Sequence, residues 1–210
     1  MDYYPIFVDL KNKPVLIIGG GNIALEKIMN LLKSGPKITV IAPWIHPRIL
    51  KFNKRIQCIN RPFEPSDIIP HYLLVFGATG DSQLNQTISA LCRQHRILCN
   101  TVDDPKYCHF IVPSLLRRGK LTVAISTAGV SPSLAKAVKD KLKQCLGCEY
   151  TVFSRWLVSF RQHVIATIPT LAGRMRFWKS FYQRDPLWHL RMGGVQRLIT
   201  LSKDTLDEHT

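Results

Sequence analysis

Three glycines separate a short apolar run from a helical pattern near the start of the chain. The apolar run covers residues 14–18, and the spacing Gly19-x-Gly21-x-x-Ala24 follows it. This spacing is typical of a turn that holds a dinucleotide pyrophosphate at a helix N-terminus. Gly19 would permit the turn, Gly21 would let the backbone approach the phosphates, and Ala24 would let helix and strand pack closely. A glycine turn in any strand–helix unit is the alternative, and the surrounding pattern favours the dinucleotide.

The next predicted strand, residues 37–42, lacks the acidic residue that usually binds the NAD ribose at its end. Ala42, Pro43 and Trp44 stand there instead. Adenosine would therefore be held by backbone groups or by packing against Trp44. Arg48 could accommodate a 2′-phosphate, so these residues leave NAD and NADP both open.

The cysteines argue against a metal centre. Cys145-x-x-Cys148 has no second pair with which to complete a zinc site. In a chain without a secretion signal, scattered cysteines indicate reduced cytoplasmic thiols. The six are Cys58, Cys92, Cys99, Cys108, Cys145 and Cys148. No apolar run reaches the ~18 residues of a membrane span, and the charged first ten residues do not form a signal peptide.

The charge balance is strongly basic. Lysine and arginine number 29 against 14 acidic residues, a formal net charge of +15. Such a chain attracts polyanions: nucleic acid, a membrane surface, or a polycarboxylate or phosphate substrate. A solvated basic surface is the plainer alternative, and charge alone does not decide between them.

Strand and helix patterns alternate through the first half of the chain. Strands are expected at residues 14–18, 37–42, 55–59, 71–78 and 96–102, and helices at 24–33, 45–53 and 82–95. This alternation predicts an α/β fold with a parallel sheet covered by helices. Ligands of such sheets lie beyond the carboxyl ends of the strands. Gly19–Gly21, Pro43, Thr79 and Asp103 would line one crevice there.

The pattern changes after residue 113. Residues 115–120 predict a turn, and residues 121–126 a strand. Ser131 and Pro132 then form a strong helix start, as N-cap and first helical residue. From Tyr150 onward the sequence is helical and rich in tryptophan and phenylalanine.

Several blocks resemble the siroheme synthase module, which combines precorrin-2 dehydrogenase with sirohydrochlorin ferrochelatase. They occur in the same order over nearly the whole chain, and the later ones are more specific than the glycine turn. The blocks are residues 1–7, 19–21, Ala78-Thr79 with Asn85, 100–105, 110–114 and 124–132. The resemblance implies the stand-alone form, because the chain ends before the methyltransferase domain of larger members could begin.

The resemblance also implies a domain organisation. An NAD-binding Rossmann-type domain would occupy residues 1–113. A dimerisation segment with a swapped strand and helix would occupy 114–147, and a small all-helical domain 148–210. The protein would be a cytoplasmic homodimer without a nucleic-acid or membrane partner.

The activity implied by the resemblance is oxidation of precorrin-2 to sirohydrochlorin, with hydride transfer to NAD. Bifunctional members then insert Fe(II). The family's cofactor contacts fall on Asn22 and Ile23 after the turn and on Pro43 and Trp44 after the second strand; Gly19, Gly21 and Thr79 complete the expected cofactor site.

The sequence departs from the family at two places. Gly80-Asp81 stands where members usually have two acids after Ala-Thr. Lys136 stands where an arginine is usual, which keeps the charge but loses a bidentate contact.

Both reactions need a proton acceptor. The resemblance places the essential acid at Asp103, and a carboxylate at a strand end beside the nicotinamide could serve dehydrogenation and chelation alike. Asp104, directly before Pro105, is expected to shape the turn. His109 is the second candidate, as a proton acceptor or iron-side ligand. The polycarboxylate substrate would explain the basic charge. Its candidate contacts are Ser126, Thr127, Ser131 and Lys136.

Two other classes of function stay open. A nucleotide-sensing Rossmann module of the kind that gates potassium transporters would bind nucleotide without catalysis. It gives no reason for the blocks at Asp103 and Ser131-Pro132. A basic nucleic-acid binder is the other class, and no recognised motif supports it.

Overall fold

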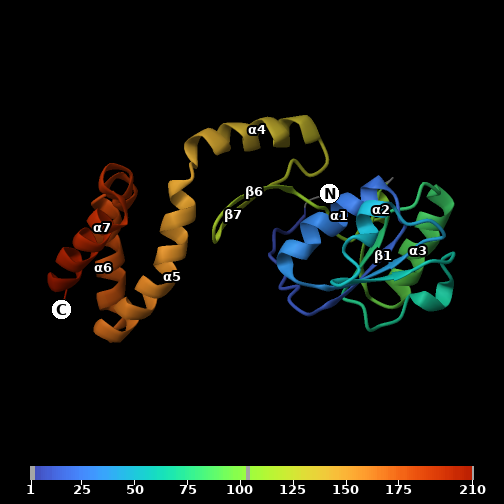
Figure 1. Cartoon of the computed structure of the whole chain (residues 1–210), viewed down its shortest axis with the longest axis horizontal. Coiled ribbons are helices and arrows are strands. Elements are labelled where there is room, and N and C mark those ends of the chain that lie inside the picture. Colours follow the sequence, from blue (N-terminus) through green and yellow to red (C-terminus); the bar gives the residue numbers. More distant parts are fainter. Residues whose placement is uncertain (1–2, 103–104, 210) are drawn as a thin grey trace. The chain divides into compact units, whose positions relative to one another are not determined.

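The computed structural model describes residues 3–102 and 105–209. The chain divides into two compact units, Met1–Val112 and Pro113–Thr210, and Figure 1 shows the elements of each. The expected subdivision of the second unit, into a dimerisation segment and a helical domain, remains a prediction.

A five-stranded parallel sheet forms the centre of the first unit. The strand order is β3-β2-β1-β4-β5. Every adjacent pair in this sheet is parallel, with Ile17 of β1 opposite Val40 of β2 and Phe76 of β4. The strands are β1 (Pro14–Ile18), β2 (Lys37–Ile41), β3 (Ile56–Ile59), β4 (Leu74–Gly77) and β5 (Leu98–Thr101). The predicted α/β fold is confirmed, with strands one to four residues shorter than expected in β2, β3, β4 and β5.

Alternating side chains of β1 bury both faces of the sheet. Val15 and Ile17 pack in one core with α1, and Leu16 and Ile18 pack in the other with Ile88 of α3. A strand covered by helices on both faces has no polar side, which explains its continuous apolar run. The helices of this unit are α1 (Asn22–Leu31), η1 (Leu32–Ser34), α2 (Pro47–Leu50), η2 (Pro65–Asp67), α3 (Ser82–Gln94) and η3 (Pro105–Tyr107).

The second unit begins with a hairpin, where the sequence predicted only a turn over 115–120. β6 (Ser114–Arg118) pairs antiparallel with β7 (Leu121–Ile125). The predicted turn is present but shorter, and the strand at 115–118 was missed because the doublets Leu-Leu and Arg-Arg hide the alternation of a strand. The real turn is Gly119-Lys120, with Gly119 at φ +62°. The Ser154 hydroxyl fastens it, accepting from the Lys120 N–H at 3.0 Å and donating to the Arg118 carbonyl at 3.1 Å.

Four helices complete the second unit: α4 (Pro132–Cys145), α5 (Glu149–Thr167), α6 (Leu171–Gln183) and α7 (Pro186–Asp207). The predicted start of α4 is confirmed, because the Ser131 hydroxyl accepts from the Leu134 N–H at 3.2 Å. Phe160, Phe177 and Phe181 form an aromatic core between α5, α6 and α7. Within the described ranges, no helix combines the length and apolarity needed to cross a bilayer.

Candidate functional site

The glycine turn after β1 has a different constraint at each position. Gly19 adopts φ +116°, and a Cβ there would lie 2.2 Å from the Ala78 carbonyl oxygen. At Gly20 a Cβ would lie 2.1 Å from the Trp44 carbonyl oxygen. A Cβ at Gly21 would meet no atom within 4 Å. Gly19 and Gly20 are therefore required by the fold, whereas Gly21 leaves an open surface.

The open surface at Gly21 lies at the N-terminus of α1. Among the side chains that the structure describes, none caps this helix, and its first turn holds no acidic residue. The first-turn N–H groups of Asn22 and Ile23 and the positive end of the helix dipole are thus available to an anion. Ala24 is fully buried against the sheet, as expected for close helix–strand packing. A glycine turn with accessible N–H groups at a helix N-terminus is the geometry that a pyrophosphate requires.

The segment after β2 is fastened to the same turn. The Gly19 N–H donates to the Ile41 carbonyl and the His46 N–H to the Gly20 carbonyl, each at 2.9 Å. Trp44 stands between these anchors with 60% of its surface exposed, and its ring meets His46 edge-on at 5.9 Å. The structure therefore presents an exposed aromatic face beside the glycine turn, where adenosine was expected.

The segment after β4 is held by internal hydrogen bonds. The Thr79 hydroxyl lies 2.8 Å from Asn85 Oδ1, and Asn85 Nδ2 donates to the Thr79 carbonyl at 3.2 Å. Asn85 is only 2% exposed. Asp81, one of the departures from the family pattern, caps α3 by accepting from the Gln83 and Leu84 N–H groups. Thr79 is thus held rigidly at the carboxyl end of β4, and its hydroxyl is hydrogen-bonded within the protein.

Residues 108–110 run along the outer edge of β5 and bond to it through both backbone and side-chain groups. Cys108 Sγ accepts from the Thr101 N–H at 3.3 Å and donates to the Thr101 carbonyl at 3.2 Å. The His109 N–H donates to the Cys99 carbonyl at 2.8 Å. The His109 ring nitrogen Nδ1 lies 3.2 Å from the Cys99 backbone nitrogen and 3.1 Å from the Ile97 carbonyl oxygen, so it accepts from the first or donates to the second according to its tautomer. This edge is therefore closed without a sixth strand.

The expected proton acceptor Asp103, and Asp104, which was expected to shape the turn, are outside the described residues. Asp103 and Asp104 follow β5 and Val102 directly in the sequence, and the structure describes neither. His109 is described, and its Nδ1 is occupied by the β5 backbone. Any part that this imidazole takes in the reaction would therefore fall to Nε2, and its catalytic role stays a prediction.

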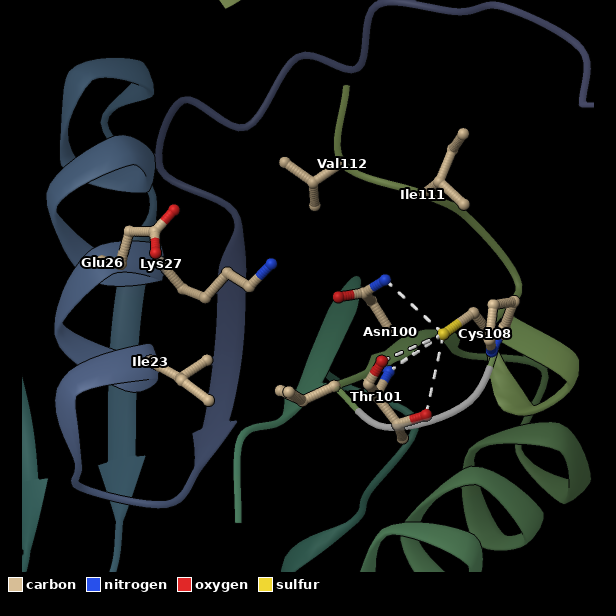
Figure 2. Close-up of a pocket in the computed structure, with 10 residues that line it drawn as sticks. Ile23, Glu26, Lys27, Asn100, Thr101, Cys108, Ile111 and Val112 are labelled. Atoms are coloured by element: carbon tan, nitrogen blue, oxygen red, sulfur yellow. Dashed lines mark hydrogen bonds between the residues drawn. The ribbon is translucent and has the colours of Figure 1, made fainter. Parts of the chain in front are cut away.

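A cavity of about 400 Å³ lies between α1 and the end of β5. Figure 2 shows Lys27 extending from α1 toward Asn100, with Ile111 and Val112 on the opposite wall. Ile23, Glu26, Thr101, Val102, Pro105 and Cys108 complete the lining. The cavity lies at the edge of the sheet where the strands end, as parallel sheets place their ligand sites.

Four of the candidate site residues belong to the second unit. The Thr127 hydroxyl accepts from the Ser131 N–H at 3.1 Å and donates to the Ser131 carbonyl at 3.0 Å. Ser126 Oγ accepts from the Ala128 N–H at 3.0 Å. Ser126, Thr127 and Ser131 thus build one tight loop before α4, and Lys136 is exposed on that helix.

The lysines of α4 stabilise the charged form of Asp140, the one acidic residue in that helix. Lys143 donates to Asp140 at 2.9 Å. That bond, with the charges of Lys143, Lys139 and Lys136, lowers the pKa of Asp140. The α4 surface is therefore suited to anionic ligands.

Sequence reasoning missed Lys27 and Cys108 as parts of the site. Lys27 follows Ile23 by four residues, so the two share a helix face, and that spacing was the available signal. Nothing in the sequence marks the Cys108 bonds to Thr101, because they depend on how residues 105–110 fold back. Among the described residues, no group of histidine, cysteine or acidic side chains could hold a metal ion, and no disulfide joins any of the six cysteines there.

Two family models match the chain. The one described as "Putative NAD(P)-binding" matches residues 6–114, and the one described as "Sirohaem biosynthesis protein central" matches residues 118–144. The first match ends two residues after the boundary between the two units, and the second lies within the second unit. The resemblance stated from sequence blocks is confirmed.

Curated relatives and a solved structure agree with these models. The siroheme synthase of Thioalkalivibrio sulfidiphilus is 36% identical over 210 residues, which cover 99% of this chain and 42% of that protein. The siroheme synthase of Zymomonas mobilis is 37% identical over 188 residues, which cover 87% of this chain and 39% of that protein. The chain thus spans about two fifths of the length of these relatives. The structure of "SirC, precorrin-2 dehydrogenase" matches with a TM-score of 0.68 at 25% identity, covering 99% of this chain and 98% of that one.

Proposed function

We propose that this chain, which belongs to the putative NAD(P)-binding family and carries the sirohaem biosynthesis central segment, oxidises precorrin-2 to sirohydrochlorin with NAD as hydride acceptor. The observation that carries the proposal is the open glycine turn beside a cavity at one edge of the sheet. A dinucleotide on the turn and a second ligand in the cavity would meet there. The likeness to a precorrin-2 dehydrogenase over nearly the whole of both chains supports this choice.

The cofactor would be held at two places. The N–H groups of Asn22 and Ile23 would bind the pyrophosphate over Gly21, and Pro43 with Trp44 would pack against adenine. Because Gly19 and Gly20 are pressed against neighbouring carbonyls, the turn is rigid before the cofactor binds. Bound NAD⁺ supplies the acceptor for hydride.

Asp103 would accept the proton that substrate loses as hydride departs. The assignment rests on its place directly after β5 in the sequence and on the family pattern. Oxidation removes two hydrogens from precorrin-2, one as hydride to NAD⁺ and one as a proton to this carboxylate. Asp104 would shape the turn before Pro105.

The loop before α4 and the lysine on that helix would bind the substrate carboxylates. Ser126, Thr127 and Ser131 form the rigid loop before α4, and Lys136 adds an exposed cation. We propose that this loop and helix hold part of the polycarboxylate. The formal net charge of +15 would draw such a substrate to the protein.

We further propose that the chain inserts Fe(II) into sirohydrochlorin, with iron as a substrate. Asp103 would then accept the pyrrole protons. His109 is the second candidate for iron handling, through Nε2, since Nδ1 binds the β5 backbone. The names of the curated relatives support this reaction less directly than the dehydrogenation.

A homodimer is the proposed assembly. Leu134 and Val138 of α4 are 54% and 37% exposed, and the two-stranded sheet β6-β7 leaves both outer edges unpaired within the described structure. A second copy would cover these groups by adding strand and helix. The six cysteines, which form no disulfide within the described residues, support the proposal of a cytoplasmic location.

The deciding experiment is incubation of the purified chain with precorrin-2 and NAD⁺, followed by sirohydrochlorin absorbance. We expect NAD-dependent formation of sirohydrochlorin. Nucleotide binding without any tetrapyrrole binding or turnover would instead favour the regulatory module.

A further inference from the structure

Lys27 is a half-buried cation in the α1–β5 cavity. Its Nζ lies 5.9 Å from the centre of the Phe76 ring, and Figure 2 shows the side chain reaching into the cavity toward Asn100. No carboxylate of residues 3–102 or 105–209 forms an ion pair with it. An aromatic face offsets only part of the cost of withdrawing an ammonium group from water.

The surroundings of Lys27 suit an anion attached to an apolar body. Ile23, Ile111 and Val112 supply apolar walls, and Asn100 is 8% exposed. The volume of about 400 Å³ is at the small end of ligand pockets, which span about 300–1,000 Å³. The cavity can therefore hold one edge of a macrocycle with its acidic arm, but not a whole polycarboxylate tetrapyrrole.

The pyrophosphate of a dinucleotide has a different place on the same helix. Lys27 comes five residues after Asn22, about 7.5 Å along the helix axis at 1.5 Å per residue. The cavity is bounded by the end of β5, whereas adenosine is expected at the end of β2. An anion at Lys27 is therefore a group other than the cofactor phosphates.

Glu26 also lines the cavity, and its carboxylate opposes an anion there. This side chain is exposed to solvent, whereas Lys27 is half-buried. Solvent screens an exposed charge more than a buried one. The ammonium of Lys27 therefore dominates the interior of the cavity.

We propose that Lys27 binds a peripheral carboxylate of the tetrapyrrole substrate, and that the α1–β5 cavity is the subsite for that acidic arm. The inference rests on the proposed function and adds to it a residue that determines substrate binding. Lys27 binds substrate and transition state alike, because the peripheral arm does not react.

The test compares Lys27→Met, which keeps the apolar stem, with Lys27→Arg, which keeps the charge. A charge-assisted hydrogen bond contributes about 1.5–3 kcal/mol, so Lys27→Met should raise the KM for precorrin-2 about 10- to 100-fold. kcat and the Kd for NAD should stay near the wild-type values, as for an interaction equal in ground and transition states. Lys27→Arg should restore most of the affinity.

Lys33→Met is the matched control, because it removes an exposed lysine just beyond α1 and should leave KM unchanged. Glu26→Gln should lower KM. If Lys27→Met fails to fold, Lys27→Gln takes its place with the same expected rise. An unchanged KM, or a weaker NAD affinity with unchanged KM, overturns the subsite.

Direct binding separates this inference from the proposed function. Quenching of protein fluorescence by sirohydrochlorin measures its Kd without turnover. If wild-type protein fails to oxidise precorrin-2 but binds sirohydrochlorin through Lys27, the subsite stands and the reaction is wrong. If oxidation proceeds and neither KM nor this Kd depends on Lys27, the reaction stands and the subsite is wrong.

Discussion

Replacing Gly21 with valine separates cofactor binding from folding. A Cβ at Gly21 meets no atom within 4 Å, and the residue has φ −84° and ψ −164°, an extended conformation that any residue adopts. The free energy of unfolding should therefore change by no more than about 1 kcal/mol, which is about 2–4 °C in Tm for a chain of this size. The side chain would occupy the place of the pyrophosphate.

The expected loss of affinity follows from the N–H groups that the valine screens. Hydrogen bonds to a charged group contribute about 1.5–3 kcal/mol each. Losing those of Asn22 and Ile23 would cost about 3–6 kcal/mol, a rise in the Kd for NAD of about 10²- to 10⁴-fold. Isothermal titration calorimetry with NAD, beside thermal unfolding of the same samples, measures both quantities.

Gly19→Ala is the contrasting variant. Its φ of +116° and the 2.2 Å approach of a Cβ to the Ala78 carbonyl require backbone strain of about 1–3 kcal/mol and a comparable cost of overpacking. We expect a Tm well below that of wild type. A folded Gly21→Val protein with wild-type NAD affinity would refute the cofactor site, and a fully stable Gly19→Ala would refute the account of the turn.

Three further predictions concern charge and protons. Added salt should weaken substrate binding steeply and NAD binding little, because exposed cations are screened over ~8–10 Å; equal salt slopes in a titration would contradict the basic substrate site. Asp103→Asn should lower the rate of oxidation by about 10²–10⁴-fold while NAD binding is retained. Asp104→Asn should lower that rate far less. Loss of iron insertion alone in His109→Ala would place iron handling at that ring. Arg61 donates to Asp67 and lowers the pKa of that carboxyl in the folded protein. The stabilisation of the fold by this ion pair is therefore complete above the unfolded-state pKa of about 3.9, and it is lost as the pH falls through the lower folded-state pKa. Asp67→Asn should flatten the acid limb of the stability curve below about pH 4, and an unchanged limb in urea titrations at several pH values would count against the pair.

Local sequence determined the regular elements of the first unit. The apolar run 14–18, the glycines after it and the alternation of strand and helix patterns were sufficient for a parallel sheet with a nucleotide turn. The reason is that period and turn chemistry are properties of neighbouring residues. The same reasoning succeeded at Ser131-Pro132, where one hydroxyl caps the next helix. It failed at β6, because adjacent leucines and adjacent arginines have no visible alternation.

Tertiary structure decided which of these residues face one another. Lys27 looks like a solvated helix residue in sequence, and only the return of residues 105–112 along the edge of β5 makes it the cation of a cavity. The Cys108 thiol likewise gains its role from Thr101, its partner along the edge of β5. Sequence spacing fixes a residue's place on its own helix or strand. The groups it meets come from distant segments, and their approach is set by the packing of the whole unit.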